Sequence, residues 1–213
     1  MESKKIFFLL DPTNFWIEKF LEKSLKDFPK KYNYVITKNQ KIIKNSIVFV
    51  LSYTKILKKN FINRNKKILI LHPSKLPKDK GFAPVQNQIL RNKRLIHCCL
   101  LEAHEKKVDS GDIIYRDTFL LSGHELSEEI RKKQAIAQLK LIRKFLKNYP
   151  RFIAYKQKGI STFNKRRKPE DSELNIDRNI KSQFNLLRIC DNDFYPAFFR
   201  YKKNTYIIKL FKK

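Results

Sequence analysis

Three short apolar runs, separated by segments with helical periodicity, constrain the fold of this chain most strongly. They are KIFFLL at residues 5–10, SIVFVLS at residues 46–52 and KILILH at residues 67–72. Continuous apolar runs of this length are typical of strands that are buried on both faces. Between the first two, apolar side chains recur at helical spacing from Phe15 to Lys26, with Thr13 or Asn14 as the expected cap. We therefore predict an α/β protein with a mostly parallel, Rossmann-like sheet covered by helices on both faces.

Other segments complete this α/β pattern. Residues 34–37 and 94–102 predict two further strands, and residues 84–91 predict a short helix that begins with proline. Residues 125–148 predict the longest helix, because apolar side chains recur on one face and charged side chains on the other. Pro150 ends this helix, since proline cannot continue the backbone hydrogen bonds.

The sequence changes character after residue 150 and becomes polar and basic. It then carries two aromatic-rich segments, residues 194–200 and 205–210, which predict a terminal β-hairpin. We expect a main domain over residues 1–149 and a small extension over residues 150–213. The apolar face of the hairpin would need covering, which suggests a homodimer.

The chain is strongly basic, with a net charge of +28 from 48 Lys and Arg against 20 Asp and Glu. Such a charge raises nucleic acid or an anionic membrane as alternative partners. The basic residues are spread along the whole chain, however, and the densest block is only residues 165–168. A nucleic-acid arm would concentrate them more, so we expect no nucleic-acid partner. The charge would instead steer a small anionic substrate toward the protein.

Cysteine, glycine and apolar content exclude several classes of protein. Cys98, Cys99 and Cys190 cannot all pair within the chain, which favours a reducing compartment. No apolar run approaches 18 residues and no leader opens the sequence, so we expect a cytoplasmic protein without a membrane partner. None of the four glycines forms a G-x-G or Walker loop. His97, Cys98 and Cys99 are adjacent strand residues that point to opposite faces, so we expect no metal.

His72 and Asp109 are the candidate chemical pair. His72 ends a predicted strand, and Pro73 holds it in an extended conformation at the edge of the sheet. Asp109 lies in a predicted turn at residues 108–111. An imidazole and a carboxylate can together manage protons at a carbonyl under attack by an amine. The alternatives are a hydrogen-bonded core histidine and a turn-forming aspartate.

The motif around these two residues resembles a known family. Residues 72–86 read H-P-S-x-L-P-x-x-x-G-x-x-P-x-Q, and residues 109–113 read D-x-G-D-I. Both are similar to the 10-formyltetrahydrofolate-dependent formyltransferases, as is LSYTKIL at residues 51–57. The resemblance is strong over residues 47–113 and weaker toward both ends.

The resemblance implies a formyl transfer from 10-formyltetrahydrofolate as cosubstrate to an amine, with His72 and Asp109 as catalytic residues and residues 1–149 as the catalytic domain. On the folate side it implies contacts from Tyr53, Ile56, Asp109 and Asp112. The family has an asparagine two residues before the histidine, where this chain has Ile70. An isoleucine cannot donate a hydrogen bond to an oxyanion, and Asn87 is one candidate replacement.

The C-terminal segments are similar to the tail of the short sugar N-formyltransferases. They are TFNKRRKPED at residues 162–171, ID at 176–177, NLLR at 185–188 and YPAF at 195–198. The implied acceptor is a nucleotide-linked amino sugar, with dTDP or UDP, of the kind used in lipopolysaccharide O-antigen biosynthesis. The implied acceptor contacts are Trp16, Ser74, Lys75, Gly81, Arg166 and Arg167.

Alternatives stay open for both the residues and the function. Trp16 and Tyr53 could be core packing, and Arg166 and Arg167 could be a solvated charge run. Formyl transfer could go to another amine, such as that of methionyl-tRNA. Ile70 favours a third alternative, a non-catalytic relative that binds folate or a nucleotide sugar.

Overall fold

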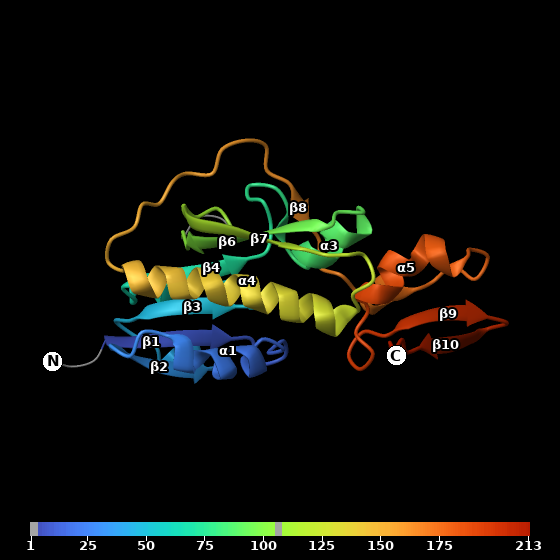
Figure 1. The fold of residues 1–213 in the computed structure, drawn as a ribbon, viewed down its shortest axis with the longest axis horizontal. Coiled ribbons are helices and arrows are strands. Elements are labelled where there is room, and N and C mark those ends of the chain that lie inside the picture. The colour runs from blue at the N-terminus through green and yellow to red at the C-terminus, as the bar shows by residue number, and fades with distance from the viewer. Residues whose placement is uncertain (1–3, 105–107) are drawn as a thin grey trace.

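A six-stranded sheet forms the centre of the protein (Figure 1). The structure is a computed structural model and describes residues 4–104 and 108–213. The strand order is β2-β1-β3-β4-β6-β7. The first four strands are parallel, whereas β6 runs antiparallel to β4 and β7 antiparallel to β6. The predicted mostly parallel sheet is therefore confirmed. The strands are β1 (Lys4–Leu10), β2 (Tyr32–Thr37), β3 (Ile47–Leu51), β4 (Lys67–His72), β6 (Leu95–Glu102) and β7 (Ile113–Leu120).

The residues after the long helix α4 (Ser127–Asn148) pack back onto the main sheet and its loops. Two short strands, β5 (Lys80–Gly81) and β8 (Phe163–Asn164), pair in parallel. Beyond the N-terminal end of α4 lie α5 (Ile180–Ile189) and the hairpin (Figure 1). The hairpin consists of β9 (Ala197–Tyr201) and β10 (Asn204–Ile208), which pair antiparallel as predicted. A one-turn helix, η3 (Pro169–Ser172), precedes α5.

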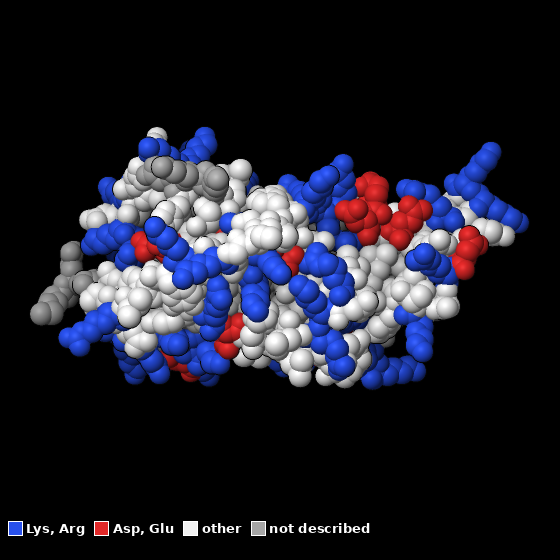
Figure 2. Space-filling view, turned by 90° about the horizontal axis from the view of Figure 1, so that it is seen from above, with Lys and Arg blue, Asp and Glu red and all other residues white. Residues whose placement is uncertain are grey.

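The surface is basic over its whole length. Figure 2 shows Lys and Arg side chains scattered along one entire face, with no single stripe that gathers them. The hairpin exposes apolar side chains, including Tyr206 and Ile207. The homodimer expected from this hairpin stays a prediction. No helix in residues 4–104 and 108–213 is long and apolar enough to cross a membrane.

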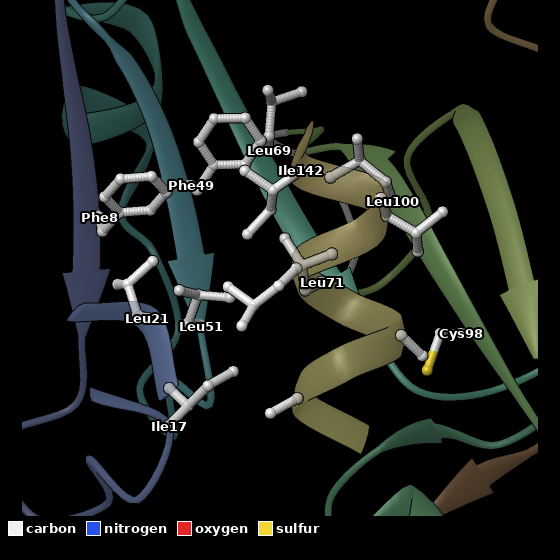
Figure 3. Packing of buried hydrophobic residues seen from close by; sticks show 14 of the residues in the cluster. Phe8, Ile17, Leu21, Phe49, Leu51, Leu69, Leu71, Cys98, Leu100 and Ile142 are labelled. Carbon is white, nitrogen blue, oxygen red and sulfur yellow. The ribbon is translucent and has the colours of Figure 1, made fainter. Parts of the chain in front are cut away.

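One face of the sheet packs against α4 and the shorter helix α1 (Glu18–Ser24), which the one-turn helix η1 (Leu25–Asp27) extends (Figure 3). This packing explains the regular apolar stripe of α4, whose buried side chains meet those of β1, β3 and β4. The facing side chains include Phe8, Phe49, Leu69, Leu71 and Ile142. Because these side chains are almost fully removed from water, this interface is the main core.

The opposite face of the sheet is covered by α2 (Lys59–Asn63) and by the turn η2 (Gln40–Ile42). Phe61 of α2 and Ile43 after η2 pack against Val48, Val50 and Ile68. Alternate residues of each central strand thus enter different cores. Helices on both faces are confirmed, and the double burial is the reason that these strands read as continuous apolar runs.

The start of α1 differs from the prediction. The helix begins at Glu18, and Ile17 precedes it without a side-chain cap. The expected caps have other partners: Thr13 donates to the Asp11 carboxylate, and the Asn14 amide donates to the Ser52 carbonyl. Both side chains therefore join loops at the carboxyl end of the sheet and do not terminate a helix.

Candidate active site

A cavity of about 610 Å³ lies at the carboxyl ends of β3 and β4. Its walls come from the turn after β3, the end of β4, the turn before α3 (Pro84–Leu90), the loop after β6 and the inner face of α4. This is the place where parallel α/β sheets bind ligands. The volume falls within the usual range for small-molecule sites.

His72 and Asp109 meet at this cavity. Nδ1 of His72 lies 3.5 Å from Oδ2 of Asp109, and both side chains are more than nine-tenths buried. On the other side of the ring, Nε2 lies 2.8 Å from the main-chain carbonyl of Asp79. A carbonyl can only accept, so Nε2 carries a hydrogen. The remaining nitrogen faces the carboxylate, and the pair can hold or release one proton beside the cavity.

Asp79 orients the histidine and is itself held firmly. Its backbone is in the left-handed region, at φ +61°, and its amide donates to Oγ1 of Thr162 at 2.8 Å. Arg91 pairs with its carboxylate, and Nζ of Lys93 lies 3.8 Å away. Its carbonyl therefore stays aligned with His72. This role could not be predicted from the sequence, because an aspartate between two lysines carries no pattern of its own.

Three interactions hold the turn that carries Asp109. The Asp109 carboxylate accepts a hydrogen bond of 2.9 Å from the amide of Gly81. A Cβ on Gly111 would lie 1.5 Å from the Glu102 carbonyl oxygen, so only glycine fits there. The amide nitrogen of Gln157, after α4, donates to the carbonyls of Asp109 at 2.8 Å and Gly111 at 2.9 Å. Gln157 is a second positioning residue that the sequence analysis missed.

Asp11 joins the two turns that form another part of the wall. Asp11 follows β1 directly and is fully buried. Its carboxylate accepts hydrogen bonds of 2.6–2.9 Å from the amides and hydroxyls of Thr13 and Thr54. Burial alone would raise the pKa of Asp11, but these hydrogen bonds outweigh it and lower the pKa to about 2. The turns after β1 and β3 are thus held together by a charge.

Six of the predicted site residues line the cavity: Trp16, Tyr53, Ile56, His72, Gly81 and Asp109. The Tyr53 hydroxyl accepts a hydrogen bond from Gln40, and burial raises the pKa of this phenol. Arg166 stands at the rim, where its guanidinium lies 5.1 Å from the ring of Phe82, another wall residue.

The other four predicted site residues lie away from the wall. Ser74 is buried and donates to the Lys78 carbonyl at 2.8 Å, whereas Lys75 is exposed. Arg167 donates to the Asp171 carbonyl at 2.7 Å within its own turn. Asp112 follows Gly111, outside the cavity lining.

Ile70 does line the cavity, two residues before His72 on β4. Asn87, the candidate replacement for the family asparagine, is turned elsewhere. Its amide nitrogen donates to the Ala83 carbonyl at 2.9 Å within α3, and the residue does not line the cavity. Its amide is therefore unavailable to a reacting oxygen beside Ile70.

Two glutamines of α4, Gln134 and Gln138, also belong to the wall. Both are buried, at 8% and 1% exposure, on a helix face that is otherwise apolar. Within residues 4–104 and 108–213, Oε1 of Gln138 has no hydrogen-bond partner. A buried amide oxygen left in this state costs about 1–3 kcal/mol of stability. In the sequence, the sign of these two wall residues is a pair of glutamines four positions apart on the otherwise apolar face of the predicted helix.

Comparison with known proteins shows which sequences and structures this chain is similar to. Residues 17–146 match a family model described as Formyl transferase. The methionyl-tRNA formyltransferase of Rickettsia felis is 29% identical over 177 residues, which cover 79% of this chain and 55% of that protein. This chain spans about half the length of the curated relatives it matches.

Two solved structures share the fold. A methionyl-tRNA formyltransferase from Clostridium thermocellum has a TM-score of 0.81 at 24% identity, covering 97% of this chain and 99% of that one. An N-formyltransferase from Helicobacter canadensis, in complex with folinic acid and dTDP-3-aminofucose, has a TM-score of 0.69 at 18% identity. It covers 95% of this chain and 85% of that one.

Proposed function

Because this chain belongs to the formyl transferase family, we propose that it transfers a formyl group from 10-formyltetrahydrofolate to the amine of a nucleotide-linked amino sugar. The observation that carries this proposal is the meeting of His72 and Asp109 on the wall of one cavity. The two residues lie 37 positions apart in the sequence, at the two motifs that resemble the family.

The proposed chemistry follows from the hydrogen bonds of the pair. The neutral amine attacks the formyl carbon, a C–N bond forms, and the carbonyl oxygen becomes an oxyanion. His72, whose Nε2 is committed to Asp79, presents its other side to this oxygen and to Asp109. The carboxylate takes a proton from the attacking amine and passes it to the departing folate nitrogen as that C–N bond breaks. The products are the formamide and tetrahydrofolate.

We assign the folate to the side of the cavity formed by Tyr53, Ile56 and Asp109, which are on the wall, with Asp112 in the adjoining turn. The acceptor then lies toward Trp16 and Gly81, with Arg166 at the rim for the diphosphate. The Helicobacter canadensis structure supports this choice, because its two ligands are a folate and a dTDP amino sugar. Surface polysaccharide biosynthesis in the cytoplasm remains part of the proposal.

Methionyl-tRNA is the second candidate acceptor, because the curated relatives at 26–34% identity are methionyl-tRNA formyltransferases. The net charge of +28 is compatible with a polyanion. Figure 2, however, shows that the basic side chains form no concentrated track on the face drawn. This distribution favours a small acceptor.

The proposal is tested by incubating the protein with 10-formyltetrahydrofolate and a panel of dTDP- and UDP-linked amino sugars. We expect tetrahydrofolate to form with at least one sugar, and His72→Ala and Asp109→Ala to abolish it. Lys78→Ala, an exposed change in the same loop, is the matched control and should retain full activity. Formylation of methionyl-tRNA alone would establish the second candidate, and absence of folate binding would contradict both.

A further inference from the structure

The strand β8 joins the segment after α4 to the loop that follows His72. After α4 the chain runs back along the molecule to β8, which pairs in parallel with β5 (Figure 1). The Lys80 amide donates to the Thr162 carbonyl at 2.9 Å, and the Phe82 amide donates to the Asn164 carbonyl at 3.1 Å. Because so short a strand is not stable alone, the pairing with β8 fixes where β5 lies.

Two backbone groups of this loop hold the catalytic side chains. The Asp79 carbonyl accepts the hydrogen bond of 2.8 Å from Nε2 of His72. Two residues later, the Gly81 amide donates to Oδ2 of Asp109 at 2.9 Å. Both partners therefore come from one short stretch of backbone, and a shift of that stretch would disturb His72 and Asp109 together.

The strand β8 packs closely against this stretch. A Cβ on Gly81 would lie 2.5 Å from Cε1 of Phe163 and 2.6 Å from the Asn164 carbonyl oxygen. Gly81 also has φ +85°, a conformation that other residues rarely adopt. The backbone at Gly81 therefore has no room to move toward β8.

Thr162 holds both peptide groups that meet at Asp79. The Lys80 amide belongs to the same planar peptide group as the Asp79 carbonyl, and the two point in opposite directions. The Thr162 carbonyl binds this peptide group on one side, and Nε2 of His72 binds it on the other. Oγ1 of Thr162 accepts from the Asp79 amide at 2.8 Å and so holds the preceding peptide group. These bonds stabilise Asp79 at φ +61°, where a residue with a Cβ is strained.

The His72 ring lies between two hydrogen-bond acceptors. The Asp79 carbonyl is 2.8 Å from Nε2, and the Asp109 carboxylate is 3.5 Å from Nδ1. A neutral imidazole carries one hydrogen, so the hydrogen bonds to its two nitrogens decide which of them bears it. If the Asp79 carbonyl turned away, the carboxylate would draw the hydrogen to Nδ1.

We propose that Thr162 is a positioning residue for His72. By holding both peptide groups of Asp79, it keeps the hydrogen of the neutral ring on Nε2 and leaves Nδ1 to exchange a proton beside Asp109. The effect on the rate rests on the proposed formyl transfer, whereas the state of the ring can be measured without turnover. The segment after α4 thus completes the catalytic pair through Thr162.

The test compares three variants of two adjacent exposed residues with the unmodified chain. Thr162→Val keeps the shape of the side chain and removes the acceptor of the Asp79 amide. Thr162→Ser keeps the hydroxyl, and Ser161→Ala is the matched control. Nitrogen NMR signals of the His72 ring, identified by their absence in His72→Gln, report which nitrogen bears the hydrogen in the protein without ligand.

We expect Thr162→Val to raise the fraction of His72 rings with hydrogen on Nδ1. It should also lower kcat for tetrahydrofolate formation about 10-fold and leave KM for 10-formyltetrahydrofolate unchanged, because the ring moves but the folate contacts remain. Thr162→Ser should restore both the ring signals and kcat, since its hydroxyl accepts the same hydrogen bond. Ser161→Ala should match the unmodified chain throughout.

The outcomes separate the role of Thr162 from the reaction. Ring signals in Thr162→Val that match those of the unmodified chain would overturn the positioning role. Equal losses of kcat and of folinic acid binding in Thr162→Val and Thr162→Ser would also overturn it, since the hydroxyl would then not matter. If the ring signals change as expected but the unmodified chain formylates no acceptor, the positioning of His72 stands and the proposed function fails. If the unmodified chain is active and Thr162→Val keeps its full kcat, the proposed function stands and the role of Thr162 fails.

Discussion

One ring nitrogen of His72 is bound to a main-chain oxygen, and this limits what the other nitrogen can do. The bond from Nε2 to the Asp79 carbonyl excludes the tautomer in which Nε2 is bare. Nδ1 is then the position at which a proton is gained or lost, and Asp109 is its neighbour. The chemistry of the site is therefore set by a backbone carbonyl in a loop that ends in Gly81, as well as by the two side chains.

Ile70 provides the sharpest test at the scale of a single residue. It lies two positions before His72 on β4, so both side chains project to the same side of the strand. An asparagine there would offer the oxyanion a donor, and one such donor is worth about 10²–10³-fold in kcat. We expect Ile70→Asn to raise the initial rate of tetrahydrofolate formation, whereas Ile70→Leu should not. An asparagine variant that folds and binds folinic acid without any gain in rate would argue that another group already stabilises the oxyanion.

At the scale of elements, Asp11 connects the turns after β1 and β3. Its pKa of about 2 lies below the ordinary value of 3.8, so its contribution to stability is complete above pH 4 and is lost as the pH falls toward 2. We expect Asp11→Asn to lower the free energy of unfolding by about 2 kcal/mol at neutral pH.

The difference between Asp11→Asn and the unmodified chain should shrink between pH 4 and pH 2, because protonation then removes the charge from the unmodified chain too. Urea unfolding at a series of pH values measures this difference. Asp27→Asn, an exposed change, is the control and should show no such trend. A difference that stays constant down to pH 2 would mean that the charge of Asp11 is not what holds the two turns.

The elements that could be predicted are those whose pattern is local. The runs that became β1, β3 and β4 are buried on both faces, and α4 repeats its stripe over 22 residues. The direction of β6 was not predicted, because a strand pattern carries no direction. The helix α5 was also missed. Its few buried side chains pack against segments distant in sequence: Leu187 against Ala197 of the hairpin, and Ile189 against the main core.

Some residues of the candidate site could likewise be predicted from local sequence patterns, and others could not. His72 and Asp109 were found through motifs that lie close together in the sequence. Asp79 and Gln157 make contacts with distant segments, such as the one between Asp79 and Asn164, which are 85 residues apart. Gln138 lines the cavity only because the folded chain brings α4 to it. Nothing local distinguishes such a glutamine from one at the surface. The cavity wall therefore depends on tertiary contacts, whereas His72 and Asp109 lie in motifs that can be read from the sequence.

At the scale of the whole molecule, the charge should affect how fast an anionic acceptor arrives. A field from +28 that is spread over the surface attracts a diphosphate from all sides and is screened by salt. We expect kcat/KM for dTDP-3-aminofucose to fall severalfold between about 0.05 M and about 0.5 M salt. The same amino sugar without its nucleotide is the control and should show little change. Equal salt dependence for both acceptors would show that the charge does not steer the substrate.

The hydrogen bonds from Gln157 to the Asp109 turn have a consequence for the order in which the protein is made. Gln157 follows Asp109 by 48 residues, so at about 5–20 residues per second a ribosome adds it roughly 2–10 s later. From the end of β7 at Leu120 until Gln157 is added, a nascent chain contains every strand of the main sheet but lacks the hydrogen bonds that hold the Asp109 turn. Translation stopped just after α4 would therefore yield a chain that contains the whole main sheet but lacks the two hydrogen bonds by which Gln157 holds the Asp109 turn.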